Sequence, residues 1–292
     1  MKIAVLSGKG GAGKTLIATN LAAALKNSLY VDCDVEEPNG HIFFNATDTA
    51  EQEVQITLPT FAADKCVGCK KCVEFCRFNA LVFIKKKPIV FGEVCHSCGG
   101  CQMVCPTGAI TEAPRTIGQL KLAQAQLSAA NGKPTKSLPI ITGVLNPGEA
   151  SGVPVIKAAE KAAFAQNASY TIIDCPPGSA CPVLESVEAA DFCLLVTEPT
   201  TFGLHNLQMV HELATLLGKP CGLVINKYQE NYAPLEEYCL EHKLPIVLRI
   251  PFSKQLAEKI SHGKLAYIHD AEFANLIDEL AKSISSAGGG CQ

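Results

Sequence analysis

The residues best placed to do chemistry stand near the start of the chain, in the run Ser7-Gly8-Lys9-Gly10-Gly11-Ala12-Gly13-Lys14-Thr15. This run follows an apolar stretch and precedes an Ala- and Leu-rich stretch, so it is predicted to be a loop between a strand and a helix. Its glycines let backbone N–H groups turn toward an anion, and the helix directs its positive end to the same point. Lys14 is expected to neutralise phosphate charge, and Thr15 to bind Mg²⁺. The predicted nucleotide contacts are Gly8, Gly10, Gly11, Ala12, Gly13, Lys14 and Thr15.

Cysteines form the second chemical pattern, because eight of the fifteen fall in two runs of identical spacing. The runs are Cys66-x2-Cys69-x2-Cys72-x3-Cys76 and Cys95-x2-Cys98-x2-Cys101-x3-Cys105-Pro106. This is the bacterial ferredoxin spacing, in which three close thiolates hold one [4Fe–4S] cluster and the distal cysteine serves the other. One cluster is therefore expected on Cys66, Cys69, Cys72 and Cys105, and the other on Cys95, Cys98, Cys101 and Cys76. Zinc is the alternative, since C-x2-C pairs also bind it.

Acidic residues follow two further apolar stretches. Asp32 and Asp34 come at the end of Ser28–Val31, and Asp174 ends the stretch Tyr170–Asp174. Carboxylates at the carboxyl ends of parallel strands, beside a phosphate loop, stand where Mg²⁺ and attacking water must be. Because side chains alternate along a strand, one of Asp32 and Asp34 should face the nucleotide while the other packs or caps. A solvated acidic turn is the alternative. Asp174 is expected to bind the Mg²⁺ shell through water.

Alternating strand and helix patterns predict an α/β fold, a mostly parallel sheet flanked by helices with a small α+β module inserted. The predicted units are the first part of the nucleotide domain, 1–58, the ferredoxin-type insertion, 59–114, and the second part, 115–292. A hairpin is expected at Ala80–Ile84 and Pro88–Phe91. Residues Thr116–Gln126 are predicted to be a short helical or extended piece, and Asn131-Gly132-Lys133-Pro134 a polar turn. An amphipathic helix, Phe273–Ile284, is expected to pack on the sheet.

Composition limits the partners. The chain has 292 residues and a formal net charge of −3, so no global field attracts nucleic acid or anionic membranes. Its hydrophobic runs are shorter than the ~20 residues of a membrane span. The first strand begins at once, leaving no room for a signal peptide, and a cytoplasmic protein is expected. Cysteine-rich runs in such a chain favour metal ligation over disulfides.

The ordered motifs together resemble one family. They are the loop at Lys9–Thr15, Asp32 and Asp34, Asp174-Cys-Pro-Pro-Gly, Val196-Thr-Glu-Pro-Thr, and Asn226. They resemble MinD/Mrp/nitrogenase-iron-protein ATPases, in the form that contains an inserted ferredoxin domain. The resemblance implies ATP and Mg²⁺ as ligands and a homodimer, or a heterodimer with a related ATPase. It also implies that Lys9 reaches the partner's nucleotide, that Asp34 positions water, and that Asn226 hydrogen-bonds adenine. A solvated lysine at position 9 and an asparagine that caps a turn are the alternatives.

Three functions follow as hypotheses. The first is an ATPase that couples nucleotide-driven dimer switching to electron transfer through two [4Fe–4S] clusters, with a redox donor or acceptor as partner. The second is an iron–sulfur assembly or carrier ATPase of the Mrp type, which would deliver clusters to an apo-protein. The third is a positioning ATPase of the partition type, which would need a basic DNA-binding face or a basic membrane helix.

Three other cysteines have no assigned chemistry. Cys175 and Cys181 are expected to be small buried or redox-inert thiols. A cluster bridging two subunits at Cys181 is not expected, because the loop Asn146–Gly152 lacks the second cysteine that it would need. Cys291 lies in a glycine-rich end and is expected to be exposed.

Overall fold

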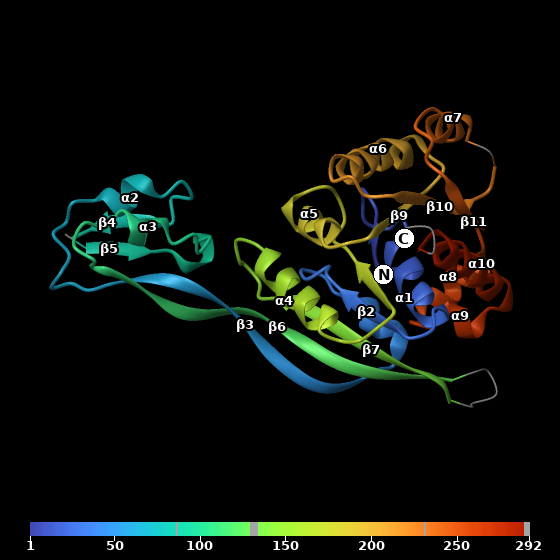
Figure 1. Ribbon diagram of the computed structural model, residues 1–292, viewed down its shortest axis with the longest axis horizontal. Coiled ribbons are helices and arrows are strands. Elements are labelled where there is room, and N and C mark those ends of the chain that lie inside the picture. Colours follow the sequence, from blue (N-terminus) through green and yellow to red (C-terminus); the bar gives the residue numbers. More distant parts are fainter. Residues whose placement is uncertain (86, 129–133, 231, 289–292) are drawn as a thin grey trace.

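A nine-stranded sheet, ordered β11-β10-β9-β1-β8-β2-β7-β6-β3, organises the computed structural model (Figure 1). The structure describes residues 1–85, 87–128, 134–230 and 232–288. Seven neighbouring strands are parallel, and two antiparallel strands, β6 (Ile110–Ser128) and β3 (Thr47–Phe61), form one edge. The mostly parallel sheet predicted from the sequence is thus confirmed. The parallel strands are β1 (Lys2–Leu6), β2 (Ser28–Asp32), β7 (Pro134–Leu145), β8 (Tyr170–Asp174), β9 (Phe192–Thr197), β10 (Cys221–Tyr228) and β11 (Ile246–Pro251).

Helices cover both faces of the parallel part, which explains why its strands are apolar almost throughout. In β1, Ile3 and Val5 pack into one core, whereas Ala4 and Leu6 pack into the other. The first core receives side chains from α1 (Lys14–Ala24), α8 (Lys254–Ser261), α9 (Ala266–His269) and α10 (Ala271–Gly288). The second receives them from α4 (Val153–Phe164), α5 (Cys181–Glu188), α6 (Thr201–Leu216) and α7 (Ala233–Glu241).

The tail helix α10 lies against this body as expected. Its residues Phe273, Ile277, Leu280 and Ile284 are buried in the first core. No helix in the described part of the chain is both long and apolar enough to cross a membrane.

The antiparallel edge differs from the sequence-based prediction. The piece Thr116–Gln126, predicted to be short and either helical or extended, is extended but belongs to the much longer, 19-residue strand β6. Its partner β3 is exposed from Thr47 to Glu53 and carries Asp48, Glu51 and Glu53 there, which suits an edge strand. The predicted insertion bounds, 59 and 114, fall inside β3 and β6. The predicted turn at Asn131-Gly132-Lys133 lies outside the described residues, and Pro134 begins β7.

Residues 62–109, which we call the cysteine module, join the ends of β3 and β6. Figure 1 shows the module held away from the nine-stranded body by the twisted β3–β6 pair. It contains α2 (Lys71–Phe75), a hairpin of β4 (Leu81–Ile84) and β5 (Lys87–Val90), the 3-10 turn η2 (Gly92–Val94), and α3 (Gly100–Met103). The hairpin matches the prediction. The module's apolar cluster has only three buried members among the described residues, Cys72, Leu81 and Ile110, so packing contributes little to its stability.

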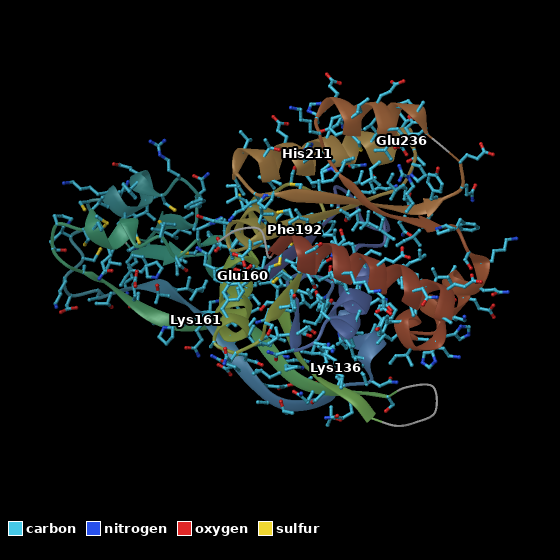
Figure 2. All side chains as sticks on the ribbon, turned by 45° about the vertical axis from the view of Figure 1, so that its right-hand side comes forward. Lys136, Glu160, Lys161, Phe192, His211 and Glu236 are labelled. Carbon is cyan, nitrogen blue, oxygen red and sulfur yellow. The ribbon has the colours of Figure 1, made fainter. Side chains whose placement is uncertain are left out.

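Two charged side chains away from the phosphate loop, Lys136 and Glu160, lie half-buried and buried in the body (Figure 2). Lys136 of β7 donates to the carbonyl of Ala22 at 2.6 Å and to the hydroxyl of Ser28 at 2.7 Å, which satisfies the end of α1. Glu160 of α4 is 4% exposed, and its Oε1 atom has no hydrogen-bond partner. Burial, together with the nearby charge of Glu185, raises the pKa of Glu160 to about 8. The folded protein therefore favours the protonated acid.

We expect Glu160→Gln to stabilise the protein at neutral pH. An acid whose folded pKa is raised contributes stability below its ordinary pKa, near 4.5, and loses it as pH rises through about 8. The loss reaches about 3 kcal/mol at pH 7, and the amide avoids it. Thermal melting from pH 5 to pH 8 measures the effect, with Glu51→Gln on exposed β3 as the matched control. A pH slope in Glu160→Gln equal to that of the wild type would contradict the assignment.

Candidate functional site

The loop between β1 and α1 has the backbone of an anion cradle. Gly11 and Gly13 have φ values of 82° and 99°, in the left-handed region that glycine adopts without strain. A Cβ atom on Gly13 would lie 2.2 Å from Nδ2 of Asn226, so close packing also requires glycine there. Helix α1 begins at the next residue, Lys14, and its free N–H groups point out of the loop end. Loop and helix together form a site for phosphate.

Lys14 is the centre of a buried charge network. Its Nζ lies 2.6 Å from Oδ1 of Asp174 and 3.8 Å from Oδ2 of Asp34. The other oxygen of Asp174 accepts a hydrogen bond from the Tyr30 hydroxyl at 2.7 Å. Burial alone would lower the pKa of Lys14, but the carboxylates of Asp174, Asp34 and Asp32 outweigh it and raise the pKa. Lys14 is therefore a fixed cation beside the carboxylates of Asp174 and Asp34.

Asp32 and Asp34 divide two roles between them. Asp34 lines the cavity beside the loop, whereas Asp32 is 1% exposed and accepts hydrogen bonds from the backbone N–H groups of Asp34 and Gly40. Burial and the charge of Asp174 raise the pKa of Asp32. Burial also raises the pKa of Asp34, and the Lys14 charge opposes this. The sequence predicted such a division, but strand alternation does not cause it, because residues two apart on a strand share a face. Asp34 lies beyond the end of β2, and its position after the strand allows it to meet water in the cavity.

A cavity of about 750 Å³ opens beside the loop. The predicted residues that line it are Gly10, Gly11, Gly13, Lys14, Thr15 and Asp34. The cavity walls also come from segments that the sequence did not indicate, at Ile42 and Phe43 in the turn η1 (Gly40–Phe44) and at Ile260–Ser261 in α8. Nucleotides are larger than one phosphate, and this volume suits a whole one.

The other predicted contacts, Gly8, Lys9, Ala12, Asp174 and Asn226, do not line the cavity. Asp174 is covered by Lys14 and Tyr30. Asn226 is 4% exposed, and its amide donates to the carbonyl of Ala12 at 2.9 Å. This bond ties β10 to the phosphate loop. Gly8 packs so tightly that a Cβ atom would lie 2.3 Å from the carbonyl oxygen of Asn206.

Lys9 is held by a carboxylate of its own chain. Its Nζ lies 3.1 Å from Oε2 of Glu198, and Nζ of Lys227 lies 2.6 Å from Oε1 of the same residue. Burial would raise the pKa of Glu198, but its hydrogen bonds and ion pairs with both lysines lower it. Lys227 also donates to the carbonyl of Gly11 at 3.2 Å. Glu198 was not among the predicted site residues, although it stands in the Val196-Thr-Glu-Pro-Thr motif.

The cysteine module contains two small cavities whose linings separate the eight run cysteines into two sets. One cavity is lined by Cys66, Cys69, Cys72 and Cys105. The other is lined by Cys76, Cys95, Cys98 and Cys101. Each set takes three cysteines from one run and the distal cysteine from the other, as the ferredoxin spacing predicted. Figure 2 shows sulfur atoms, in yellow, gathered in this module.

The Cys105 thiol has a polar surrounding. Burial would raise its pKa, but hydrogen bonds from the backbone N–H groups of Thr107, Ala109 and Ile110 outweigh this and lower the pKa. Such N–H groups stabilise a thiolate. Among the described residues, no group of three or more His, Cys, Asp or Glu side chains is arranged to hold a single metal ion.

The remaining cysteines differ from one another. Cys175 is buried, as expected. Cys181 is exposed at the start of α5, so of the two expected alternatives, buried or redox-inert, burial does not apply to it. Ala180 and Pro182, on either side, line the cavity beside the phosphate loop. Cys291 lies outside the described residues.

A phosphate loop between the first strand and first helix of a mostly parallel sheet defines the P-loop NTPase class. The chain belongs to the family of CobQ/CobB/MinD/ParA nucleotide-binding domains, whose model matches residues 3–266. Two uncharacterized proteins of Methanocaldococcus jannaschii are similar along their length. One is 31% identical over 263 residues, covering 89% of each chain, and the other is 27% identical over 289 residues, covering 97% of each.

Solved structures show the same fold. The septum site-determining protein MinD of Pyrococcus horikoshii, complexed with Mg-ADP, superposes with a TM-score of 0.59 at 19% identity. The match covers 99% of this chain and 97% of that one. At this identity the likeness concerns the fold, and function must be argued from the site.

Proposed function

We propose that this protein hydrolyses ATP and couples its nucleotide state to electron transfer through two [4Fe–4S] clusters in the cysteine module. The observation that carries the proposal is the division of eight cysteines into two cavities of four, on a module attached to a nucleotide-binding body. Each iron of a four-iron cluster takes one thiolate, so the ligands surround a large group. The four cysteines of each run and the closing Cys105-Pro106 favour clusters over zinc.

The side chains of the nucleotide site have distinct roles in this proposal. The loop N–H groups and Lys14 bind the phosphates, and the Thr15 hydroxyl binds Mg²⁺. A bound phosphate group would compete with Asp174 for Lys14, and Asp174 would then be free to help hold Mg²⁺. Asp34, at the cavity wall, orients the attacking water, and Asn226 fixes the loop from β10.

Lys9 acts on the nucleotide of a second subunit, in a homodimer or a heterodimer with a related ATPase. For this it must leave Glu198, and Lys227 remains to neutralise the carboxylate. Hydrolysis then depends on dimer formation. An exposed ion pair costs about 1 kcal/mol or less to break, so the exchange is energetically accessible.

In the cysteine module, the eight thiolates would hold the clusters, and backbone N–H groups at Cys105 stabilise the charge there. When bound, the clusters would supply one-electron transfer at low potential. Cys69 and Cys98 are exposed, one in each set, so each cavity has an edge open to a redox partner.

The test is anaerobic purification of the full chain, followed by iron analysis, ATPase rates and cluster reduction potentials with and without Mg-ATP. We expect hydrolysis together with potentials that change with nucleotide. Unchanged potentials, combined with iron transfer to an apo-acceptor, would reject coupled electron transfer and favour the carrier function, for which the exposed Cys69 and Cys98 also argue. The partition-type alternative shares the MinD fold, but fold likeness does not decide between these functions.

A further inference from the structure

Arg115 joins the body to the cysteine module. It lies on β6, where its guanidinium forms two hydrogen bonds with Glu149, of 2.7 and 2.8 Å. The Glu149 side chain is 6% exposed and that of Arg115 is 24% exposed, so water screens this pair less than a surface ion pair. Two parallel hydrogen bonds from a planar fork fix direction as well as distance.

On the module side, Arg115 supports the turn that leads into the second cysteine set. A Cβ atom on Gly92 would lie 3.4 Å from Nε of Arg115 and 3.0 Å from Cδ1 of Leu58, so the turn rests on both side chains. The next residue, Glu93, has a carboxylate oxygen 4.0 Å from the guanidinium. The N–H of Cys95 donates to the carbonyl of Gly92 at 3.2 Å, and Cys95 lines the second cavity.

On the body side, Glu149 belongs to a loop that reaches the nucleotide cavity. At the start of this loop, the N–H of Leu145 donates to the carbonyl of Val35 at 2.8 Å. At its end, a Cβ atom on Gly152 would lie 2.6 Å from Cγ2 of Val35. Both Val35 and Gly152 line the cavity beside Asp34. A displacement of the Asp34 segment therefore displaces the loop that holds Glu149.

We propose that Arg115 is a positioning residue that transmits nucleotide-dependent movement of the loop 146–152 to the Cys95 end of the cysteine module. This inference rests on the proposed function, because it requires nucleotide to alter the Asp34 segment. Every step between Asp34 and Cys95 is a direct contact or a short stretch of backbone. The Arg115–Glu149 pair is the side-chain link across the two parts, and its rigid fork transfers displacement that a flexible lysine would absorb.

Hydrogen exchange of the full chain, purified anaerobically and measured with and without Mg-ATP, tests the proposal. We expect Mg-ATP to change exchange in both 146–152 and 92–95, by about fivefold or more in rate. In Arg115→Met and Arg115→Lys, the change in 146–152 should persist and the change in 92–95 should be lost. The exchanged pair Arg115→Glu/Glu149→Arg should restore part of it.

Arg249→Met is the matched control. Arg249 makes a similar two-bond contact with Glu236, at 2.8 and 2.9 Å, between β11 and α7. Its loss should leave the nucleotide response of 92–95 as in the wild type. A merely structural role for Arg115 predicts faster exchange in 92–95 without nucleotide, and an unchanged response to it.

Each other outcome separates the two proposals. Persistence of the 92–95 response in Arg115→Met, or its absence in the wild type, overturns the role of Arg115 and leaves the proposed function standing. If the protein contained no iron but still showed the Arg115-dependent response, the role of Arg115 would stand and electron transfer would be rejected. Failure of the wild type to bind Mg-ATP would overturn both.

Discussion

If the protein hydrolyses ATP as proposed, we expect Lys14→Ala to reduce hydrolysis by at least about 10²–10³-fold, the loss typical of removing one charged group that stabilises the reacting phosphate. It also weakens ATP binding, because Lys14 is the buried cation that faces the cavity. Steady-state hydrolysis and calorimetric titration with Mg-ATP measure the two losses. If Lys14→Ala hydrolysed ATP at the wild-type rate, Lys14 would not be part of the phosphate site.

The same substitution should also lower the stability of the protein, because it removes the cation from a group of buried carboxylates. Asp174 and Asp32, 0% and 1% exposed, would lose their neighbouring cation. An unpaired buried charge costs about 3–5 kcal/mol, so Lys14→Ala should melt at a lower temperature. The double variant Lys14→Ala/Asp174→Asn should recover much of this stability and no activity. It separates a folding defect from a catalytic one.

Lys9→Ala is the informative contrast. Lys9 is partly exposed and shares Glu198 with Lys227, so its removal should cost about 1 kcal/mol or less in stability. If Lys9 acts in a second subunit, hydrolysis falls about 10²-fold or more while binding of Mg-ATP is retained. Retained hydrolysis would reject that role.

Cys105→Ala should remove the cluster held by Cys66, Cys69, Cys72 and Cys105, although Cys105 belongs to the second run in sequence. Iron content should fall from about eight atoms per chain to about four. The spectrum of the reduced protein should then match that of Cys69→Ala. Cys76→Ala should match Cys98→Ala in the same way. Electron paramagnetic resonance of the reduced proteins, with iron analysis, makes the comparison.

If instead Cys105→Ala matched Cys98→Ala, each run would serve its own cluster, and the grouping of the two cavities would be wrong for the loaded protein. Loss of one cluster should also loosen the module, because only Cys72, Leu81 and Ile110 form its buried apolar cluster. Metal binding supplies folding free energy in such small units. Hydrogen exchange in β4 and β5 should increase in all four variants, whereas exchange in β1 should not change.

Local spacing made the chemical residues predictable. The phosphate loop, the Asp32 and Asp34 pair and the spacing within each cysteine run show in a few neighbouring residues, because each function requires particular atoms at short range. The parallel strands also showed, since burial on two faces makes them apolar throughout. The first half of the edge strand β3 did not, because Thr47–Glu53 is exposed and carries no apolar alternation; only Val54, Ile56 and Leu58 further along the strand alternate with polar residues.

Ion pairs between residues far apart in the chain could not be predicted from local sequence patterns. Lys9 and Glu198 are 189 positions apart, and Arg115 and Glu149 are 34 apart. A single charged residue on a half-exposed strand has no local pattern that names its partner. The exposure of the Cys181 thiol could not be read from the sequence either, since it depends on where α5 begins.

The β3–β6 pair gives the cysteine module the geometry of a lever. On its other side, β6 is paired with β7 only as far as Gly118, which pairs with Leu145 at the end of β7 and with Val54 of β3. This row of three residues is the fulcrum. Beyond that fulcrum, the seven residues Gln55–Phe61 continue with a single partner strand over roughly 23 Å. A swing of about 10° at the fulcrum would move the tip by about 4 Å over this length. Because the module lies at the far end of this pair, a small tilt of the pair at its base displaces the module by several ångströms.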